Sequence, residues 1–413
     1  MKRPRRRQLL AGVGGLGSLA VGRYLGSPGL FGDALALSTD VPTGVWQERG
    51  RGPRRSGYAP EADGPTDEFS EQWSVDVDWA NDTYAGSIVV DSDHVYVPET
   101  DALVALDRDD GSEQWRFEPP SVPGPVLDGP DVDEERSLWS SFLACRDGRV
   151  FVTARPDGFD VLYAVDAATG SVAWALPETG GITLLGDGLV CYASNEDYCI
   201  DAESGQTRTT MTGMTYGAVY LDTTVDEFGE YDQFPYVTTN RYDGLDRAFV
   251  TVESTTNASD HAVTADGVAF TVIDSRRVEA DHAVVDVRNG ASRLVSATVP
   301  HPTVSVIDGE RWYVFGNGSA AALPAIDPQI DGDPIEPQWQ RSVDTVVGRP
   351  AVTDAAVYVP TEAGLLVLDP SSGEVLTHRG GHAVGEWEWW SPVVAGDTLY
   401  CRLGDSDDLH AFR

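Results

Sequence analysis

Three tryptophans stand within four positions in the segment GEWEWWSP, residues 385–392, where they are well suited to ligand recognition. Trp387, Trp389 and Trp390 offer large flat surfaces on which a sugar or a planar cofactor can stack, or against which a partner's side chain can be anchored. Because two glutamates alternate with them, the three rings cannot all face the same way. We expect Trp387 and Trp390 to be the two that face a ligand.

Other aromatic residues occupy comparable places, each shortly before an apolar segment. They are Tyr84 before AGSIVV, Trp139 before SSFLAC and Tyr216 before GAVYL. A ring of such side chains around a funnel is one way to build a binding site for a carbohydrate, a cofactor or a partner protein. Packing between neighbouring sheets is the other role that these aromatic residues can serve.

Catalytic and metal-binding patterns are missing from the sequence. The seven histidines are scattered, with neither an H-E-x-x-H nor a G-x-S-x-G motif. His378 and His382 are four residues apart, but they stand in a strand-and-loop context in which that spacing does not place them on one face, so we expect surface positions. The acidic runs at 128–135 and 405–408 suit Ca²⁺, but acidic loops are the rule in this composition. We therefore predict no catalytic residue and no metal site.

Four cysteines and three glycosylation sequons fit an exported protein. Cys191 and Cys199 flank a hairpin pattern, YASNEDY, and can form a disulfide across its two strands. Cys145 and Cys401 lie in apolar segments, where we expect small buried side chains. The candidate glycosylation sites are Asn81, Asn257 and Asn317.

The net charge of −37 limits the possible partners and indicates the environment. Lys occurs once, at position 2, and the other strong bases are arginines. An acid-rich, Lys-poor surface is typical of proteins kept soluble in concentrated salt, which screens their self-repulsion, and resembles that of extreme halophiles. Such a surface argues against nucleic-acid binding, which needs clustered cations.

The N-terminus resembles an export signal. Residues 1–36 begin with a basic stretch that holds Arg6-Arg7-Gln8, typical of a twin-arginine signal, and continue with a short apolar segment and the small-x-small sequence ALA. Either the signal is cleaved or it stays as an anchor, the only membrane contact that we expect. Residues 37–70 have no strand-length apolar run and are predicted to be a leader.

From residue 71 to 413 the sequence is a succession of short strands in units of roughly 40–50 residues, typical of a propeller. Residues 87–117 show one unit of four strands, in which DRDDG closes a hairpin and Trp115 supplies a surface to bury between sheets. The last unit, 391–412, has only three strands, whereas SEQWSVDV at 70–77 matches a fourth strand. We therefore predict a propeller in which the N-terminal strand completes the last blade.

The number of blades depends on residues 213–257, which contain three plausible strands but no Asp-x-x-x-Gly turn. If this segment is a blade, the propeller has eight. If it is an insertion, the propeller has seven. Even spacing around a ring favours eight.

The segment DAATGSVAW, the upstream LYAVD and the opening strand SPVV resemble the PQQ-repeat propellers, a family that includes quinoprotein alcohol dehydrogenases and the non-enzymatic assembly factor BamB. The resemblance covers roughly residues 44–413, and its lead-in resembles exported haloarchaeal members. For the dehydrogenases it implies a quinone in the central channel, covered by a disulfide between adjacent cysteines, with Ca²⁺ beside it. This chain has no adjacent cysteines, so PQQ is not supported and no cofactor is expected.

These observations predict an exported, non-catalytic propeller that binds a protein partner or a small ligand at the outer face of the cell. The alternatives are a PQQ-dependent dehydrogenase and a carbohydrate-binding module. The sequence does not identify the partner, the process or the oligomeric state.

Overall fold

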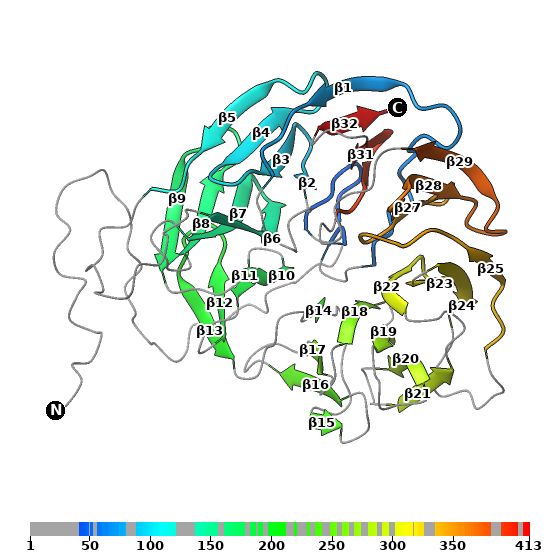
Figure 1. The fold of residues 1–413 in the computed structure, drawn as a ribbon. Coiled ribbons are helices and arrows are strands. Elements are labelled where there is room, and N and C mark those ends of the chain that lie inside the picture. The colour runs from blue at the N-terminus through cyan, green and yellow to red at the C-terminus, as the bar shows by residue number, and fades with distance from the viewer. Residues whose placement is uncertain are drawn as a thin grey trace, which may run out of the picture.

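The computed structural model describes residues 41–48, 50–52, 56–79, 88–120, 137–155, 161–177, 182–186, 189–192, 197–211, 219–220, 229–231, 236–241, 248–253, 258–263, 268–273, 280–286, 291–296, 302–316, 318–325, 335–380, 390–403 and 408–413. Within these ranges every regular element is a strand, and the strands form eight four-stranded sheets. The sheets stand around a common centre like the blades of a propeller (Figure 1). The predicted all-β propeller fold is confirmed.

Most blades are antiparallel meanders whose strands pair in chain order. Blade 1 contains β2 (Val89–Val90), β3 (His94–Pro98), β4 (Leu103–Asp107) and β5 (Glu113–Phe117). Blade 2 contains β6 (Ser137–Arg146), β7 (Arg149–Arg155), β8 (Val161–Asp166) and β9 (Val172–Pro177). Blade 3 contains β10 (Ile182–Gly186), β11 (Leu189–Tyr192), β12 (Asp197–Asp201) and β13 (Thr207–Met211). Blade 5 contains β18 (Ala258–Val263), β19 (Val268–Ile273), β20 (Ala280–Asp286) and β21 (Ala291–Ser296). Blade 6 contains β22 (Pro302–Ile307), β23 (Arg311–Gly316), β24 (Ser319–Pro324) and β25 (Trp339–Ser342). Blade 7 contains β26 (Ala351–Val352), β27 (Val357–Thr361), β28 (Gly364–Leu368) and β29 (Val375–Gly380).

Blade 4 departs from this order. Its strands β14 (Val219–Tyr220), β15 (Gly229–Tyr231), β16 (Tyr236–Arg241) and β17 (Ala248–Glu253) pair in the order β14-β17-β16-β15. This is the segment at which the sequence left a blade and an insertion as alternatives. Its strands form a sheet, but one with a strand order that the repeat did not predict.

Blade 8 joins the two ends of the described chain. It contains β30 (Val393–Ala395), β31 (Thr398–Arg402), β32 (Leu409–Phe412) and, as its fourth strand, β1 (Glu71–Val75). β1 pairs antiparallel with β32, with Trp73 opposite Ala411, and the amides of Ser70 and Arg413 each donate to the other's carbonyl oxygen at 2.8 and 3.0 Å. The strand missing from the C-terminal unit is therefore supplied by β1, as predicted.

The hairpins between third and fourth strands owe their shape to an Asp and a Gly four residues apart. In blade 2 the Asp166 carboxylate accepts hydrogen bonds from the amide and hydroxyl of Thr169, and Gly170 adopts a φ of +69°. A positive φ is easily adopted only by Gly, and a carboxylate can satisfy the amides of a tight turn. The same pair recurs as Asp107 with Gly111 in blade 1.

A tryptophan on the fourth strand docks each of these hairpins onto the preceding blade. Trp115 of blade 1 donates from its indole Nε1 to the carbonyl oxygen of Ala167 in blade 2 at 2.8 Å, and its ring lies on Gly170, where a Cβ would come within 2.8 Å of the indole. The same contact is made by Trp73 on Gly111, Trp174 on Gly205 and Trp339 on Gly373. Opposite Trp115 lies Ala105, whose small side chain leaves room for the ring.

The core lies between the blades because side chains alternate across each strand. In β3, Val95 and Val97 belong to the layer shared with blade 8, whereas Tyr96 between them belongs to the layer shared with blade 2. Each blade thus contributes to two hydrophobic layers, which explains why its strands are apolar on both faces.

The junction between blades 7 and 8 has no docking tryptophan. Thr377 takes the place of Trp in β29, opposite Val367, and the next blade has no third-to-fourth hairpin because β32 and β1 meet there. Arg379 joins the blades instead. Its guanidinium lies 5.0 Å from the centre of the Phe69 ring and donates to the Phe69 carbonyl oxygen at 2.8 Å. A cation over an aromatic face contributes about 0.5–2 kcal/mol.

The docking contact predicts different costs for two glycine substitutions. Gly170→Ala must strain a positive φ and push against Trp115, whereas Gly148→Ala has a φ of +72° but nothing within 4 Å of its new Cβ. We expect about 1 kcal/mol of destabilisation for Gly148→Ala and about 2–4 kcal/mol for Gly170→Ala, measured by denaturant unfolding. Equal losses would contradict the docking role of the glycine.

Acid should remove the contribution of the Asp166 turn. The Thr169 hydroxyl and then Arg149 hold the pKa of Asp166 below its usual value. A lowered folded-state pKa stabilises the protein above the unfolded pKa, near 4, and this contribution is lost as the pH falls through the lower folded value. The stability difference between wild type and Asp166→Asn should therefore shrink below about pH 4. Asp344→Asn, at an exposed site outside the turn, is the control. If the stability difference between wild type and Asp166→Asn does not change with pH, the stabilising role of the Asp166 carboxylate is contradicted.

Candidate functional site

The two ends of the propeller differ in how much of their surface is already occupied. In an antiparallel meander the first and third hairpins lie at the same end of the sheet. We call this end the turn end, and it includes residues 91–93, 107–111, 353–355 and 396–397. The second hairpins and the connections between blades lie at the other, the connection end, which includes residues 76–79, 99–102, 345–350 and 361–364.

A segment that precedes β1 lies across the turn end. This strap, residues 43–48, 50–52 and 56–64, exchanges backbone hydrogen bonds with inner strands or turns of blades 1, 2, 6, 7 and 8. Its partners are the backbone groups of Val90, Cys145, Ile307, Val352 and Gly396, at 2.7–3.0 Å. The strap is drawn in blue near the centre of Figure 1. The sequence predicted a leader over 37–70, yet the described part of that segment is packed into the folded body.

Buried polar residues hold the strap in its path. Arg51 is 7 % exposed, adopts a φ of +80°, donates to the Tyr58 carbonyl oxygen at 2.6 Å and forms an ion pair with Glu61. A positive φ costs an arginine roughly 1–2 kcal/mol, so these contacts must offset strain as well as desolvation. The arginine thereby fastens the turn around Gly50 to the second half of the strap.

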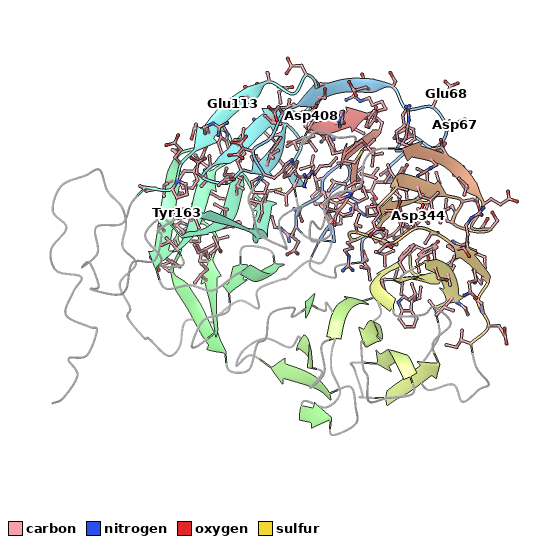
Figure 2. The ribbon with its side chains drawn as sticks, in the orientation of Figure 1. Asp67, Glu68, Glu113, Tyr163, Asp344 and Asp408 are labelled. Carbon is pink, nitrogen blue, oxygen red and sulfur yellow. The ribbon has the colours of Figure 1, made fainter. Side chains whose placement is uncertain are left out.

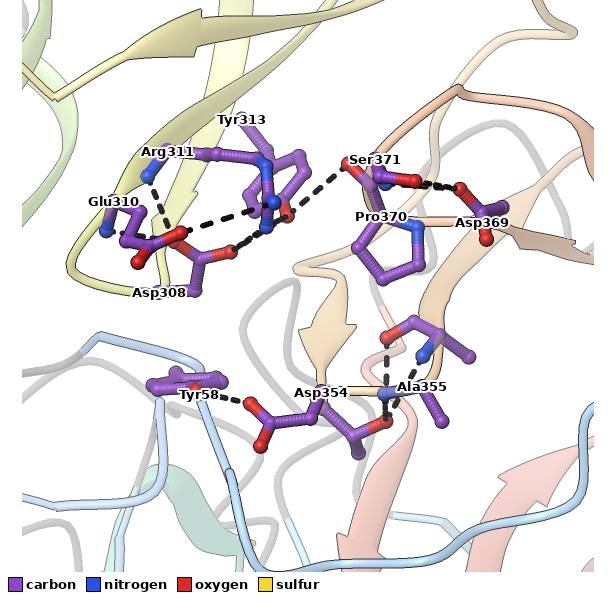
Figure 3. Close-up of polar contacts among 12 residues, drawn as sticks. Tyr58, Asp308, Glu310, Arg311, Tyr313, Asp354, Ala355, Asp369, Pro370 and Ser371 are labelled. Carbon is purple, nitrogen blue, oxygen red and sulfur yellow. Dashed lines mark hydrogen bonds and ion pairs between the residues drawn. The ribbon is translucent and has the colours of Figure 1, made fainter.

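The carboxylates at the turn end are engaged in structural hydrogen bonds, as Figure 3 shows for blades 6 and 7. Asp308 accepts from the amides of Glu310 and Arg311 at 2.9 and 2.7 Å and from the Tyr313 hydroxyl at 2.7 Å. The Tyr58 hydroxyl donates to Asp354. Burial and then Asp308 raise the pKa of Tyr313, so its phenol stays protonated. These groups stabilise turns.

Arg108 ties three parts of the turn end together. Its guanidinium donates to the carbonyl oxygens of Gly44 in the strap at 2.9 Å, Asp91 in blade 1 at 2.7 Å and Ala395 in blade 8 at 3.0 Å. The planar, five-donor guanidinium suits such a divergent set of acceptors, which a single ammonium group cannot span. The turn end of blades 8 and 1 is thus closed by the chain's own groups.

At the connection end, the segments after β1 and β25 each pair with the second hairpin of the following blade. Trp79 pairs with Glu99 of blade 1, and Val346 pairs in the same way with Thr361 of blade 7. The Arg402 guanidinium lies over the Trp79 ring, 4.9 Å from its centre. Trp79, which was not among the predicted candidates, therefore lies at this end, half-buried against blade 8.

Trp390 is the predicted candidate whose side chain the structure describes. It is 2 % exposed within the core layer of blades 7, 8 and 1, and its amide donates to the Val347 carbonyl oxygen at 3.2 Å. Its indole N–H is buried without a hydrogen-bond partner. Beside it, the amide of Arg349 donates to the Ser391 hydroxyl at 3.1 Å. In this conformation Trp390 packs between blades and does not face a ligand. Packing between neighbouring sheets was the second role that the sequence analysis gave to these aromatic residues.

The remaining candidates are placed by the chain alone. Tyr84, Tyr216, Trp387 and Trp389 lie outside the described residues, in connections between one blade and the next. The backbone of Trp139 lies in β6 opposite Thr153.

The cysteines follow their predicted pattern where the structure describes them. Cys145 and Cys401 are buried and free, and burial raises the pKa of both thiols. Cys191 and Cys199 lie directly opposite each other in β11 and β12, the arrangement that a cross-strand disulfide requires, and the bridge itself stays a prediction. Asn81, Asn257 and Asn317 lie outside the described residues.

The described residues form neither a metal-binding cluster nor a membrane-spanning helix. In these ranges no group of three or more His, Cys, Asp or Glu side chains is arranged to hold a metal ion. The same part of the chain contains no helix with the length and hydropathy needed to cross a bilayer.

The comparisons with known proteins agree with the propeller. The family model described as outer membrane protein assembly factor BamB matches residues 67–186, which span β1, blades 1 and 2, and β10. No curated protein matches the chain significantly. These findings place a BamB-like repeat in the first part of the chain.

Solved structures match over most of the chain at low identity. BamB from Moraxella catarrhalis has 13 % identity and a TM-score of 0.51, with 84 % of this chain and 100 % of that chain covered. A europium-containing methanol dehydrogenase has 13 % identity and a TM-score of 0.54, covering 86 % and 89 %. Quinohemoprotein alcohol dehydrogenase ADHIIG from Pseudomonas putida HK5 has 14 % identity and a TM-score of 0.54, with 90 % of this chain and 80 % of that chain covered. At these identities the likeness concerns the fold.

The closed turn end predicts a large effect of a conservative substitution. Arg108→Lys keeps the charge but loses most of the carbonyl contacts, and we expect a loss of about 2–4 kcal/mol in unfolding free energy. Arg116→Lys is the matched control. Its guanidinium pairs with Glu99 and Glu113 at the surface, so its loss should stay below about 1 kcal/mol. Similar losses in both variants would contradict the special role of Arg108.

Proposed function

We propose that this chain is an exported, non-catalytic propeller that binds a partner protein at its connection end and serves as a scaffold at the outer face of the cell. The observation that carries the proposal is the strap, which covers inner strands or turns of blades 1, 2, 6, 7 and 8 at the turn end. A partner then reaches the propeller from the opposite end, where Trp79 lies half-buried in the connection between blades 8 and 1.

The BamB-like family match favours a binding role in general, because the protein named in that model is an assembly factor. The dehydrogenases among the structural neighbours share the fold, and fold alone does not determine function. The sequence lacks the adjacent cysteines expected over a bound quinone, and the described part of the chain offers no cluster of metal ligands. The residues therefore do not fit a quinone–metal centre, and we derive no catalytic step.

The sequence of residues 1–36, with its twin arginines and short apolar segment, supports the proposed export. The twin-arginine pathway is suited to proteins that fold before transport. The acidic composition suits a salt-rich exterior. We therefore place the scaffold outside the cytoplasmic membrane, released or held by its own signal segment.

Crosslinking from the two ends tests the binding face. A photo-crosslinker attached to Glu362→Cys in the second hairpin of blade 7 should capture a partner protein on intact cells, because this exposed site lies at the connection end. The same reagent on Asp93→Cys, an exposed site in the first hairpin of blade 1, is the matched control and should capture much less. Equal capture, or capture from Asp93→Cys alone, would contradict the proposed face.

Titration with PQQ and Ca²⁺ tests the alternative enzyme function. We expect no saturable change in tryptophan fluorescence in a protein whose far-UV spectrum shows it to be folded. Saturable, Ca²⁺-dependent quenching at micromolar quinone would instead support a quinoprotein dehydrogenase.

A further inference from the structure

The blades that carry a docking tryptophan share a row of three residues that lie directly opposite one another on the second, third and fourth strands. We call it the packing row, and it consists of an aromatic residue, Ala and Trp. The aromatic ring lies 5.7–6.1 Å from the tryptophan, and each row belongs to the hydrophobic layer shared with the following blade. The rows are Tyr96–Ala105–Trp115, Phe151–Ala164–Trp174, Tyr313–Ala322–Trp339 and Tyr400–Ala411–Trp73.

Blade 3 has cysteines in its packing row. Strands β11, β12 and β13 place Cys191, Cys199 and Thr209 directly opposite one another. The register of β12 with β13 shifts just after Cys199, as the register in blades 1 and 2 shifts just after Ala105 and Ala164, and the Asp of the turn follows two residues later in all three blades. The cysteines therefore take the places of the aromatic residue and the alanine.

The residue before Cys199 supports the same alignment. In blade 2, Tyr163, labelled in Figure 2, belongs to the layer shared with blade 1, and Ala164 after it belongs to the layer shared with blade 3. In blade 3, Tyr198 and Cys199 follow in the same order. Because successive residues of a strand lie on opposite faces, the register places both cysteines on the face of blade 3 that is turned toward blade 4.

Loss of the tryptophan does not by itself explain the cysteines. Blade 7 also lacks it, yet its row keeps an aromatic residue, Tyr358, opposite Val367 and Thr377. Two thiols in place of a ring and a methyl group remove most of the apolar volume of the row. A covalent bond between β11 and β12 is the interaction by which such a pair can compensate for this loss.

The two positions meet the distance requirement of a disulfide. Residues directly opposite in an antiparallel pair have Cα atoms about 4.5–5.5 Å apart, and disulfides join Cα atoms about 4.4–6.8 Å apart. Cys145 and Cys401, in contrast, lie singly in blades 2 and 8, where they are buried and free.

We propose that Cys191 and Cys199 form a disulfide that replaces the packing row of blade 3, so that the oxidation state of one bond determines how firmly β11 and β12 hold together. As the bond forms, the two thiols lose two protons and two electrons to a disulfide-containing oxidant, which is reduced to two thiols. Such bonds persist in oxidising environments outside the cytoplasm, so their occurrence in the cell rests on the proposed export. The experiments use purified protein and do not depend on a partner at the connection end.

Alkylation in denaturant, followed by mass spectrometry, tests the bond in the wild-type protein. A chain purified without reductant should take up two alkyl groups, at Cys145 and Cys401, and four after reduction. Four alkyl groups without reduction, or alkylation at Cys191 and Cys199 before reduction, would overturn the proposal.

Hydrogen exchange tests the role of the bond. Mild reduction of the folded protein should speed the exchange of amides in β11 and β12 at least tenfold. Amides of β7 and β8, which carry the Phe151–Ala164 part of the row in blade 2, are the internal control and should stay unchanged within twofold. Unchanged exchange in β11 and β12 after reduction would overturn the proposal.

Two variants separate replacement of the packing row from a general loss of stability. Cys191→Ser with Cys199→Ser should exchange like the reduced wild type, whether or not reductant is present. Cys191→Phe with Cys199→Ala copies the row of blade 2 and should slow exchange in β11 and β12 at least threefold relative to the serine variant. Equal exchange in the two variants, or a response of the serine variant to reductant, would contradict the proposal.

Discussion

The contact between a tryptophan and the glycine turn of the next blade is the interaction on which this propeller depends. A four-stranded blade is apolar on both faces and cannot bury them alone, so its stability comes from its neighbours. Trp115 meets this need twice, since its ring covers Gly170 and its indole N–H satisfies the Ala167 carbonyl oxygen. Because a Cβ at Gly170 would collide with the indole, the contact also fixes how closely two blades approach.

The seam of the ring shows what replaces this contact where it cannot form. Blade 8 has no hairpin for a tryptophan because its third strand, β32, and its fourth strand, β1, are not consecutive in the chain. Arg379 therefore joins blade 7 to Phe69, and Arg108 joins blades 8 and 1 to the strap. Both arginines act through backbone carbonyls, which any sequence offers, and so the seam needs few matched side chains. The cost is an outer strand, β29, with nothing to bury.

The parts of the structure that the sequence predicted are those encoded by neighbouring residues. The Asp107–Gly111 turn, the docking Trp115 and the completing strand β1 each have a local signature, and the structure has all three. The strap has none, because it is held through backbone hydrogen bonds to strands far away in the chain. The burial of Trp390 and the strand order of blade 4 likewise depend on tertiary contacts that a pattern of residue types does not contain.

This division also explains why the fold is easier to read than the function. At the described part of the turn end, carboxylates such as Asp308 cap turns, Arg108 binds carbonyl oxygens, and the strap lies beside the inner strands. A substitution there changes stability before it changes recognition. The connection end is built from segments outside the repeat, so its residues are free of the spacing that the docking tryptophans impose. Under the proposed function, specificity for a partner comes from those connections, where Trp79 lies, because a fold alone does not determine function.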